Sequence, residues 1–554
     1  MSVVLVTGAT GTVGRQVAAQ LTAAGVGIKP LSRATGDLRD PGSLPLDGVE
    51  AVFLVWPFAS AEGAAPVVGE IARRVRRVVY LSSAAVREPE REIERLIEES
   101  GPEWTFLRPH AFAANTLRWA RQVRAGVVRG AYGQAAMPLV HERDIAAVAV
   151  RALLDDGHHG AVHALTGPES LTQADQLRII SEVLKFPARW VEVPPDEARA
   201  DLLATGLPAA VADDVLRAQA ALVSHPAPVT RTVEEVTKAA PRTFRQWVAD
   251  HAADFREVPA PATTMRAARL HEYGGPIHHD RIPTPRPGPG EVLIEVAGNS
   301  FNPSELGLRA GLLRNLFELD LPHTFGWDVS GTVVETGPGV TDPAPGERVF
   351  GLVTGSAADY VVAPASLLAP APRSIPLADA AAVPVAGLTA WQAVHEQAPL
   401  APGQRVLING AGGGIGLFAV QLARLAGATV TATASPRSAA AVARYGAHEV
   451  IDYTTTPLPG GMDVVLNLAG IPAEQATVLA GLGRTVLTAA TPIEGGTHFV
   501  MRNDPAQLAE LAALIDKGEL AVEVVETHPL TELAEIHRRA EAGDTRGKII
   551  LLPA

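Results

Sequence analysis

Residues 7–14 read TGATGTVG, and residues 410–416 read GAGGGIG. Each of these glycine-rich stretches follows an apolar run, VVLV at 3–6 and RVLIN at 405–409, and each precedes a segment of helical character. Glycine lets the backbone turn tightly and approach a ligand closely, and the helix that follows offers its free N–H groups to a pyrophosphate. The pattern predicts two dinucleotide-binding units of alternating strands and helices in one chain.

The strand that follows each loop indicates which dinucleotide is bound. The run at 27–33 ends in Ser32 and Arg33, and the run that begins at Thr429 leads to Ser435 and Arg437, with no acidic residue at either end. An acidic residue there would bind a ribose 2′-hydroxyl, whereas hydroxyl and guanidinium groups suit a 2′-phosphate. We therefore expect two NADPH sites in each chain. The expected cofactor-binding residues are Gly8, Thr10, Gly11, Thr12, Val13, Gly14, Ser32 and Arg33 in the first site, and Ala411, Gly413, Gly414, Ile415, Gly416, Ser435 and Arg437 in the second.

Composition narrows the class of protein. The chain has 554 residues, which is too long for one hydrophobic core, and 47% of them are hydrophobic. A net charge of −13 argues against nucleic acid and anionic membranes as partners. The chain has no cysteine, which excludes disulfides and thiolate metal ligands, and it shows no signal peptide and no apolar run long enough to span a membrane. We expect a cytoplasmic enzyme.

Changes in residue composition and hydrophobic pattern along the chain indicate the domain organisation. Residues 1–256 alternate apolar runs with helical segments, and end in an Ala/Leu-rich helical region that resembles a small lid. The Pro/Ala-rich segment 257–264 is the expected linker, and Met265 begins a stretch that reads like the start of a second protein. We expect a small β-barrel lobe from 265–385 and 521–554, and a second Rossmann lobe from 386–520. The predicted fold is α/β, with two doubly wound parallel sheets and a β-barrel lobe in the C-terminal half.

The N-terminal half resembles the NmrA-like, atypical short-chain dehydrogenases. The resemblance is carried by TGATGTVGR, VVYLSSAAV at 78–86, EWTFLRP at 103–109 and PRTFRQWVADHAADF at 241–255. Members include NADPH-dependent reductases and cofactor-binding regulators without turnover. Ordinary short-chain dehydrogenases use a Tyr-x-x-x-Lys pair as proton donor, and no tyrosine in this chain has a lysine four residues later. By their position after strand ends, Ser82, Ser83, His110 and Asn115 are the pocket candidates, with Ser82 and His110 as the candidate catalytic groups.

The C-terminal half resembles the zinc-independent quinone oxidoreductases of the medium-chain dehydrogenase/reductase superfamily. The motifs are MRAARLHEYGGP at 265–276, SFNPSELGLRAG at 300–311, FGWDVSGTVVETGPGV at 325–340 and YGAHEVIDY at 445–453. The resemblance implies a GroES-like β-barrel lobe and a Rossmann lobe with the nicotinamide between them. It also implies pairing of two chains into a homodimer through Rossmann edge strands. Zinc members carry a cysteine ligand and a Gly-His-Glu segment, whereas this chain has no cysteine and reads Gly326-Trp327-Asp328. No metal is therefore expected.

Without a Lewis acid, hydride transfer is easiest to an electron-poor quinone or to the β-carbon of an α,β-unsaturated carbonyl, an enone. The oxyanion that develops then needs only hydrogen-bond donors and a proton. The resemblance makes Asn302 the first choice for that polar contact, Thr389 a residue on the nicotinamide side, and Asp328 a brace between the two lobes.

Two hypotheses follow for the whole chain. In the first, both halves are NADPH-dependent reductases. In the second, only the C-terminal half turns over a quinone or enone, and the N-terminal half is an NADPH-sensing or protein-binding module, because it lacks Tyr-x-x-x-Lys. A scaffold without catalysis in either half is a third reading.

Overall fold

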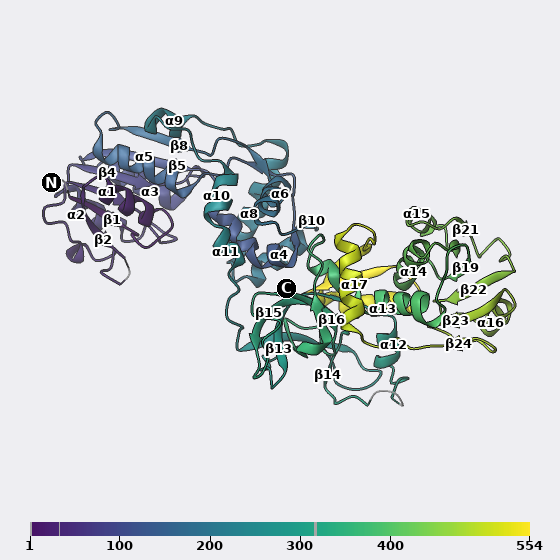
Figure 1. Ribbon diagram of the computed structural model, residues 1–554. Coiled ribbons are helices and arrows are strands. Elements are labelled where there is room, and N and C mark those ends of the chain that lie inside the picture. Colours follow the sequence, from purple (N-terminus) through teal and green to yellow (C-terminus); the bar gives the residue numbers. More distant parts are fainter. Residues whose placement is uncertain (1–2, 33, 315–317, 554) are drawn as a thin grey trace. The chain divides into compact units, whose positions relative to one another are not determined.

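The computed structural model describes residues 3–32, 34–314 and 318–553 (Figure 1). Its contacts divide the chain into two units. The first unit comprises Met1–Arg121, Val128–Lys185 and Trp190–Arg256, and the second comprises Glu257–Ala554 with the short segments Gln122–Val127 and Phe186–Arg189.

The first unit contains a six-stranded parallel sheet in the order β2-β1-β3-β4-β5-β8. Alternate residues of a strand point to opposite faces, so Val4 and Val6 pack with helices α1 and α5, while Leu5 packs with α2 and α3. Both faces of the sheet are therefore covered by helices, which confirms the doubly wound fold expected for this half. The bounds are β1 Val3–Thr7, β2 Gly27–Leu31, β3 Ala51–Leu54, β4 Arg77–Leu81, β5 Glu103–Pro109, β8 Ala161–Leu165, α1 Gly14–Ala23, α2 Ala64–Ala72, α3 Glu88–Glu98 and α5 Glu142–Leu154.

The rest of the first unit is mainly helical. Two short two-stranded ladders, β10 with β6 and β7 with β9, accompany the helices. Trp247 on α10 is fully buried and stacks on Phe244 at a ring-centroid distance of 5.7 Å. The bounds are α4 Ala120–Ala125, β6 Val127–Gly130, β7 Ala136–Met137, β9 Leu171–Thr172, α6 Gln173–Leu184, β10 Arg189–Glu192, α7 Pro195–Ala204, α8 Ala209–Ser224, α9 Thr232–Thr237, α10 Phe244–Asp250 and α11 Ala252–Arg256. Most of α4 and the first residue of β6 and of β10 fall in the segments that belong to the second unit.

The β-rich lobe of the second unit is built around one long strand, β13 (Glu291–Ser300). It pairs with β15 along most of its length, with β17 through Glu291–Glu295, and with β26 through Asn299 and Ser300. Because β13 changes partner along its length, the pairings among the described residues run in the order β18-β16-β15-β13-β26-β25, with β17 as a branch on β13. This β-rich lobe is the one expected beside the second Rossmann lobe. The other bounds are β11 Thr264–Leu270, β12 Ile277–Pro283, α12 Ser304–Arg309, β14 His323–Thr324, β15 Asp328–Thr336, β16 Arg348–Leu352, β17 Tyr360–Pro364, β18 Leu368–Pro370, β25 Val524–Pro529, α18 Leu533–Glu541 and β26 Lys548–Leu552.

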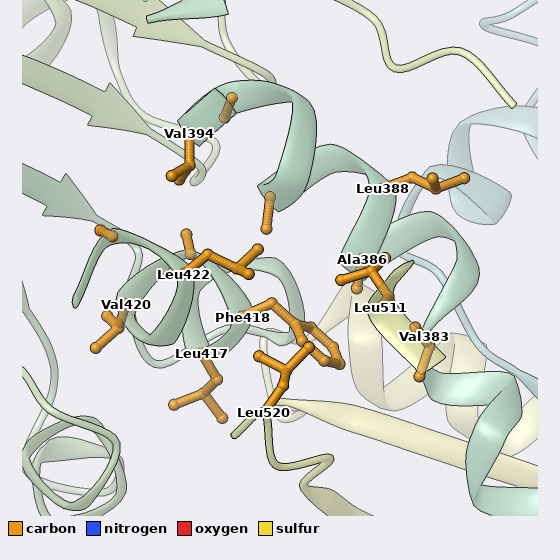
Figure 2. Packing of buried hydrophobic residues seen from close by; sticks show 14 of the residues in the cluster. Val383, Ala386, Leu388, Val394, Leu417, Phe418, Val420, Leu422, Leu511 and Leu520 are labelled. Atoms are coloured by element: carbon orange, nitrogen blue, oxygen red, sulfur yellow. The ribbon is translucent and has the colours of Figure 1, made fainter. Parts of the chain in front are cut away.

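The second unit also contains a parallel six-stranded sheet, in the order β21-β20-β19-β22-β23-β24, which confirms the second Rossmann-type sheet. Figure 2 shows Phe418 and Leu422 of α14 facing a cluster that includes Leu511 of α17 and Val394, which follows α13. These contacts fix the helix that follows the second glycine loop. The bounds are α13 Pro384–Gln392, β19 Arg405–Asn409, α14 Gly414–Leu425, β20 Thr429–Thr433, α15 Ala439–Arg444, β21 Glu449–Ile451, β22 Met462–Asn467, α16 Ala473–Ala480, β23 Gly483–Thr488, β24 Thr497–His498 and α17 Pro505–Asp516. In the described part of the chain, every helix is too short or too polar to cross a membrane.

Candidate functional site

The first glycine loop is a tight turn between β1 and α1. Gly8 has a φ of +62°, which side chains rarely allow, and its carbonyl accepts the N–H of Gly11 at 2.8 Å. A Cβ added to Gly14 would lie 2.1 Å from the carbonyl oxygen of Gly8. Thr10, Gly11 and Thr12 are exposed, while Val13 is buried and directly precedes α1, whose start has no side-chain cap. The loop therefore offers exposed main chain at an uncapped helix start, as a pyrophosphate site requires.

The second glycine loop has the same construction between β19 and α14. Gly410 has a φ of +82°, and its carbonyl accepts the N–H of Gly413 at 3.1 Å. A Cβ on Gly416 would lie 2.3 Å from the Gly410 oxygen, and a Cβ on Gly412 would lie 2.1 Å from Oγ of Ser438. Helix α14 begins at Gly414 without a side-chain cap, between buried Ala411 and half-buried Ile415. Only glycine fits these close approaches, so the fold requires glycine there.

A row of polar side chains joins the carboxyl ends of four neighbouring strands beside the second loop. Thr433 Oγ1 donates to Asn409 Oδ1 at 2.8 Å, and Asn409 Nδ2 donates to Asn467 Oδ1 at 2.8 Å. Asn467 Nδ2 then donates to Thr488 Oγ1 at 3.3 Å, and Thr433 Oγ1 accepts the N–H of Gly410 at 3.1 Å. Sequence reasoning missed these residues, although each is the polar last residue of an apolar strand. Ligands of open parallel sheets bind outside this edge, so the row holds the loop that would face the cofactor.

Asn302 lies in a buried polar cluster of the β-rich lobe. Its Nδ2 donates to Oδ2 of Asp328 at 2.9 Å and to the carbonyl of Ser300 at 3.2 Å, and its Oδ1 accepts from Nζ of Lys548 at 3.1 Å. The amide is 4% exposed, and both of its hydrogens are used within the protein. As placed, the side chain of Asn302 holds the cluster together and has no hydrogen left for an oxyanion.

Asp328 is the centre of that cluster. Its Oδ2 lies 3.1 Å from Nζ of Lys548 and accepts from Oγ of Ser300, and its Oδ1 accepts the N–H of Val385 at 2.8 Å. Val385 belongs to α13, the helix that carries Thr389. Asp328 therefore links the β-rich lobe to α13.

Glu305 is a second buried acid beside Asn302. Its Oε1 accepts the N–H of Asn302 at 3.0 Å, and its Oε2 has no hydrogen-bond partner among the described residues. Burial raises the pKa of Glu305 to about 8, so the carboxyl is mostly protonated at neutral pH. With neutral Glu305, the charges of Asp328 and Lys548 balance.

The side chains of the other residues expected in the second site make contacts outside this cluster. Thr389 is 5% exposed, and its hydroxyl donates to the carbonyl of Val385 at 2.7 Å. Ser435 is half-buried after β20, and Arg437 is 63% exposed with Nη1 3.8 Å from Oδ1 of Asp544. An exposed arginine beyond the strand end remains available to an anionic ligand.

In the first unit the candidates follow the ends of neighbouring strands β4 and β5. Ser82 is 8% exposed and donates to Oε1 of Glu94 at 2.7 Å, and Glu94 is also paired with Arg108 at 2.6 Å. The Ser82 hydroxyl is thus committed to the buried carboxylate of the Glu94–Arg108 ion pair. His110 is half-buried, and burial lowers its pKa, which favours a neutral imidazole. Ser32 is half-buried, Ser83 accepts the N–H of Ala85 at 3.2 Å, and Asn115 is exposed; Arg33 lies outside the described residues.

Two family patterns match the second unit. The pattern described as "Alcohol dehydrogenase GroES-like domain" matches residues 288–373, and that described as "Zinc-binding dehydrogenase" matches residues 445–551. The chain is 31% identical to the chloroplast envelope quinone oxidoreductase homolog of Arabidopsis thaliana, over 52% of this chain and 98% of that protein.

Two further relatives align over a shorter part of the chain. A (4-alkanoyl-5-oxo-2,5-dihydrofuran-3-yl)methyl phosphate reductase of Streptomyces griseus is 40% identical over 46% of this chain and 99% of its own. An NAD(P)H azoreductase of Xenophilus azovorans is 32% identical over 46% of this chain and 99% of its own. Among solved structures, the quinone oxidoreductase of Coxiella burnetii is 27% identical with a TM-score of 0.49, covering 52% of this chain and 100% of that one. Through the patterns in its C-terminal half and its likeness to the Arabidopsis protein, the chain belongs to the quinone oxidoreductases of the medium-chain dehydrogenase/reductase superfamily and is an oxidoreductase.

Proposed function

We propose that this protein is an NADPH-dependent reductase that transfers a hydride to a quinone or an enone in its C-terminal half, without zinc. In this proposal the N-terminal half is a second, NmrA-like reductase with its own NADPH site. The observation that carries the proposal is the shared construction of the two loops, in which a Cβ at Gly14 or Gly416 would collide with the carbonyl oxygen of the glycine that opens the loop, Gly8 or Gly410. The tight turn brings the main chain to the uncapped start of the following helix, where the free N–H groups of the first turn suit a pyrophosphate.

The preference for NADPH over NADH rests on the residues after β20. Ser435 is half-buried and Arg437 exposed, and the strand ends without a carboxylate that a 2′-phosphate would repel. Relatives named NAD(P)H oxidoreductases, from mouse and from cattle, support a nicotinamide cofactor for this chain.

Zinc does not fit the residues of the second unit. The chain has no cysteine to serve as a zinc ligand, and Trp327 stands where zinc members carry histidine. Both carboxylate oxygens of Asp328 are engaged by Lys548, Ser300, Asn302 and Val385. A metal at Asp328 would have to displace a buried ammonium, so no step of the reaction is assigned to a metal.

The chemistry that remains is hydride addition to an acceptor that is already electron-poor. NADPH supplies the hydride when bound, and one proton from solvent completes the reduction, so that a quinone becomes a hydroquinone and an enone a saturated carbonyl. The chain's own residues bind the pyrophosphate through the second loop and hold α13 and β13 in fixed positions through Asp328 and Asn302. Such prior positioning is itself a large part of catalysis.

The motifs of residues 1–256 support the reading of the N-terminal half as a reductase. Reductases are also among the relatives, since the Streptomyces reductase and the Xenophilus azoreductase each align over 46% of this chain. The name of the Streptomyces substrate describes an acylated, unsaturated lactone ring, which belongs to the same broad class of acceptors as an enone. The alternative is an NADPH-sensing module, favoured by the commitment of Ser82 to Glu94 and by the absence of Tyr-x-x-x-Lys.

The test is the number of NADPH molecules bound by the full chain in isothermal calorimetry. We expect two sites in the native protein, and loss of a different one in each of Gly14→Ala and Gly416→Ala. Gly69→Ala and Gly460→Ala are matched controls, because an added Cβ meets nothing within 4 Å at either position. Both controls should retain two sites.

The reductase activity of the loop variants then distinguishes a second reductase from an NADPH-sensing module in the N-terminal half. Loss of NADPH-dependent quinone or enone reduction only in Gly416→Ala supports a sensing N-terminal half, whereas a second activity lost only in Gly14→Ala supports two reductases. Two sites retained in both loop variants would contradict the proposed cofactor sites.

A further inference from the structure

Lys548 is a buried lysine on the last strand of the chain. It is one of five lysines in the sequence, and only 4% of it is exposed. A buried ammonium is costly unless it is paired and fully hydrogen-bonded. Its Nζ lies 3.1 Å from Oδ2 of Asp328 and 3.1 Å from Oδ1 of Asn302. Two specific partners therefore engage the end of this buried side chain.

These two partners belong to different elements of the second unit. Asn302 lies just beyond the end of β13. Asp328 begins β15, and through the N–H of Val385 it holds the first turn of α13. Without the ammonium, Oδ1 of Asn302 would lose its donor and Asp328 its counter-charge.

The methylene chain of Lys548 reaches a third element, the start of helix α14. A Cβ added to Gly414, the first residue of α14, would lie 2.7 Å from Cδ and 3.2 Å from Cγ of Lys548. The methylene chain therefore occupies the space beside the start of the helix that follows the second glycine loop. One side chain thus contacts the cofactor helix with its stem, and the β-rich lobe with its charge.

We propose that Lys548 is a positioning residue for hydride transfer, which holds Asn302, Asp328 and the start of α14 in one fixed arrangement. The inference rests on the proposed NADPH-dependent reduction in the C-terminal half. Lys548 does not touch the reacting atoms in this proposal, and it acts through Asn302 and through the Asp328–Val385 contact. Misplacement of reacting groups by about an ångström lowers rates by about 100-fold, so the effect falls on kcat more than on cofactor affinity.

The test compares charge removal at Lys548 with the same change at an exposed lysine. A single Lys548→Met change would leave Asp328 buried without a counter-charge, so the informative variant is Lys548→Met with Asp328→Asn, which removes both charges. Lys517→Met is the matched control, because Lys517 is exposed at the end of α17 in the same unit. Lys548→Arg tests whether a cation at this position restores function.

Three measurements are made on the full chain: kcat and KM with NADPH and 1,4-benzoquinone, the NADPH dissociation constant by fluorescence, and amide hydrogen exchange without cofactor. For the double variant we expect kcat to fall about 10- to 100-fold while the dissociation constant changes less than about 3-fold. Exchange should accelerate at Val385 and at the start of α14. The Lys517→Met protein should match the native one, and Lys548→Arg should recover part of kcat.

The inference is overturned if the double variant keeps kcat within about twofold of the native value and its exchange pattern is unchanged. It is also overturned if exchange accelerates uniformly across the unit, because Lys548 would then serve stability alone. A native protein that neither binds NADPH nor reduces the quinone would refute the proposed function instead, and the exchange of the cofactor-free protein would still decide whether Lys548 fixes Val385 and α14.

Discussion

At the scale of single residues, Glu305 makes the stability of the second unit depend on pH. Its pKa is raised to about 8 by burial, against 4.5 for an exposed glutamate. Between these values the folded protein holds a proton that the unfolded chain releases, so this group's contribution to stability is present below pH 4.5 and is lost as pH rises through about 8, at up to about 1.4 kcal/mol per pH unit. We expect Glu305→Gln to remove this slope, because the amide oxygen can still accept the N–H of Asn302.

The measurement is the unfolding free energy of the second unit between pH 5 and pH 8.5. The variant should be more stable than the native protein at pH 8, and the difference should shrink toward pH 5. Glu519→Gln, at an exposed glutamate of the same unit, is the control. Parallel stability curves for the native protein and Glu305→Gln would refute the assignment of a neutral acid.

At the scale of elements, helix α18 depends on a neutral histidine. His537 is fully buried, its ring lies 5.2 Å from that of Phe301 and 5.4 Å from that of Phe325, and neither ring nitrogen has a hydrogen-bond partner among the described residues. Burial lowers the pKa of His537 to about 3. In this pH range the imidazole is protonated in the unfolded chain but stays neutral in the folded protein. The free energy of unfolding therefore falls as pH drops from about 6.5 to about 3.

We expect His537→Leu to reduce the loss of stability at acid pH. The check is amide exchange in α18 together with unfolding at pH 4, 5 and 7, where acid should loosen the native helix but not that of the variant. His498→Leu changes an exposed histidine of the same unit and should leave the acid dependence intact. Equal acid sensitivity in all three proteins would mean that other groups dominate.

The elements themselves divide into those that the sequence predicts and those that it does not. The two parallel sheets can be predicted from apolar runs that alternate with glycine loops and helical segments, because this pattern lies within short stretches of the sequence. Short β-rich runs also predict the β-rich lobe, but not its strand pairings, because the partners of β13 change along its length and no local pattern records such a change. The contact between Lys548 and Asn302 joins residues 246 positions apart, so only tertiary structure can show that the expected polar contact at Asn302 is already satisfied from within.

At the scale of the whole molecule, the two units have separate hydrophobic cores. Phe53 is fully buried in the core of the first unit, and Phe418 is 3% exposed in the largest core of the second. No buried residue is shared between these two clusters. Truncation of a buried phenylalanine to alanine costs about 3–5 kcal/mol in the core that contains it. We therefore expect Phe53→Ala and Phe418→Ala to lower the stability of different units.

The measurement is differential scanning calorimetry of the full chain. Two transitions are expected, with Phe53→Ala lowering one midpoint and Phe418→Ala the other. Val223→Ala and Val478→Ala, at valines that are 45% and 55% exposed, should change stability by less than about 0.5 kcal/mol. A single transition that both phenylalanine variants lower equally would show that the two cores unfold as one cooperative body. In that case a variant in either half would change the population of folded cofactor sites in both, and the loop variants would have to be compared at matched stability.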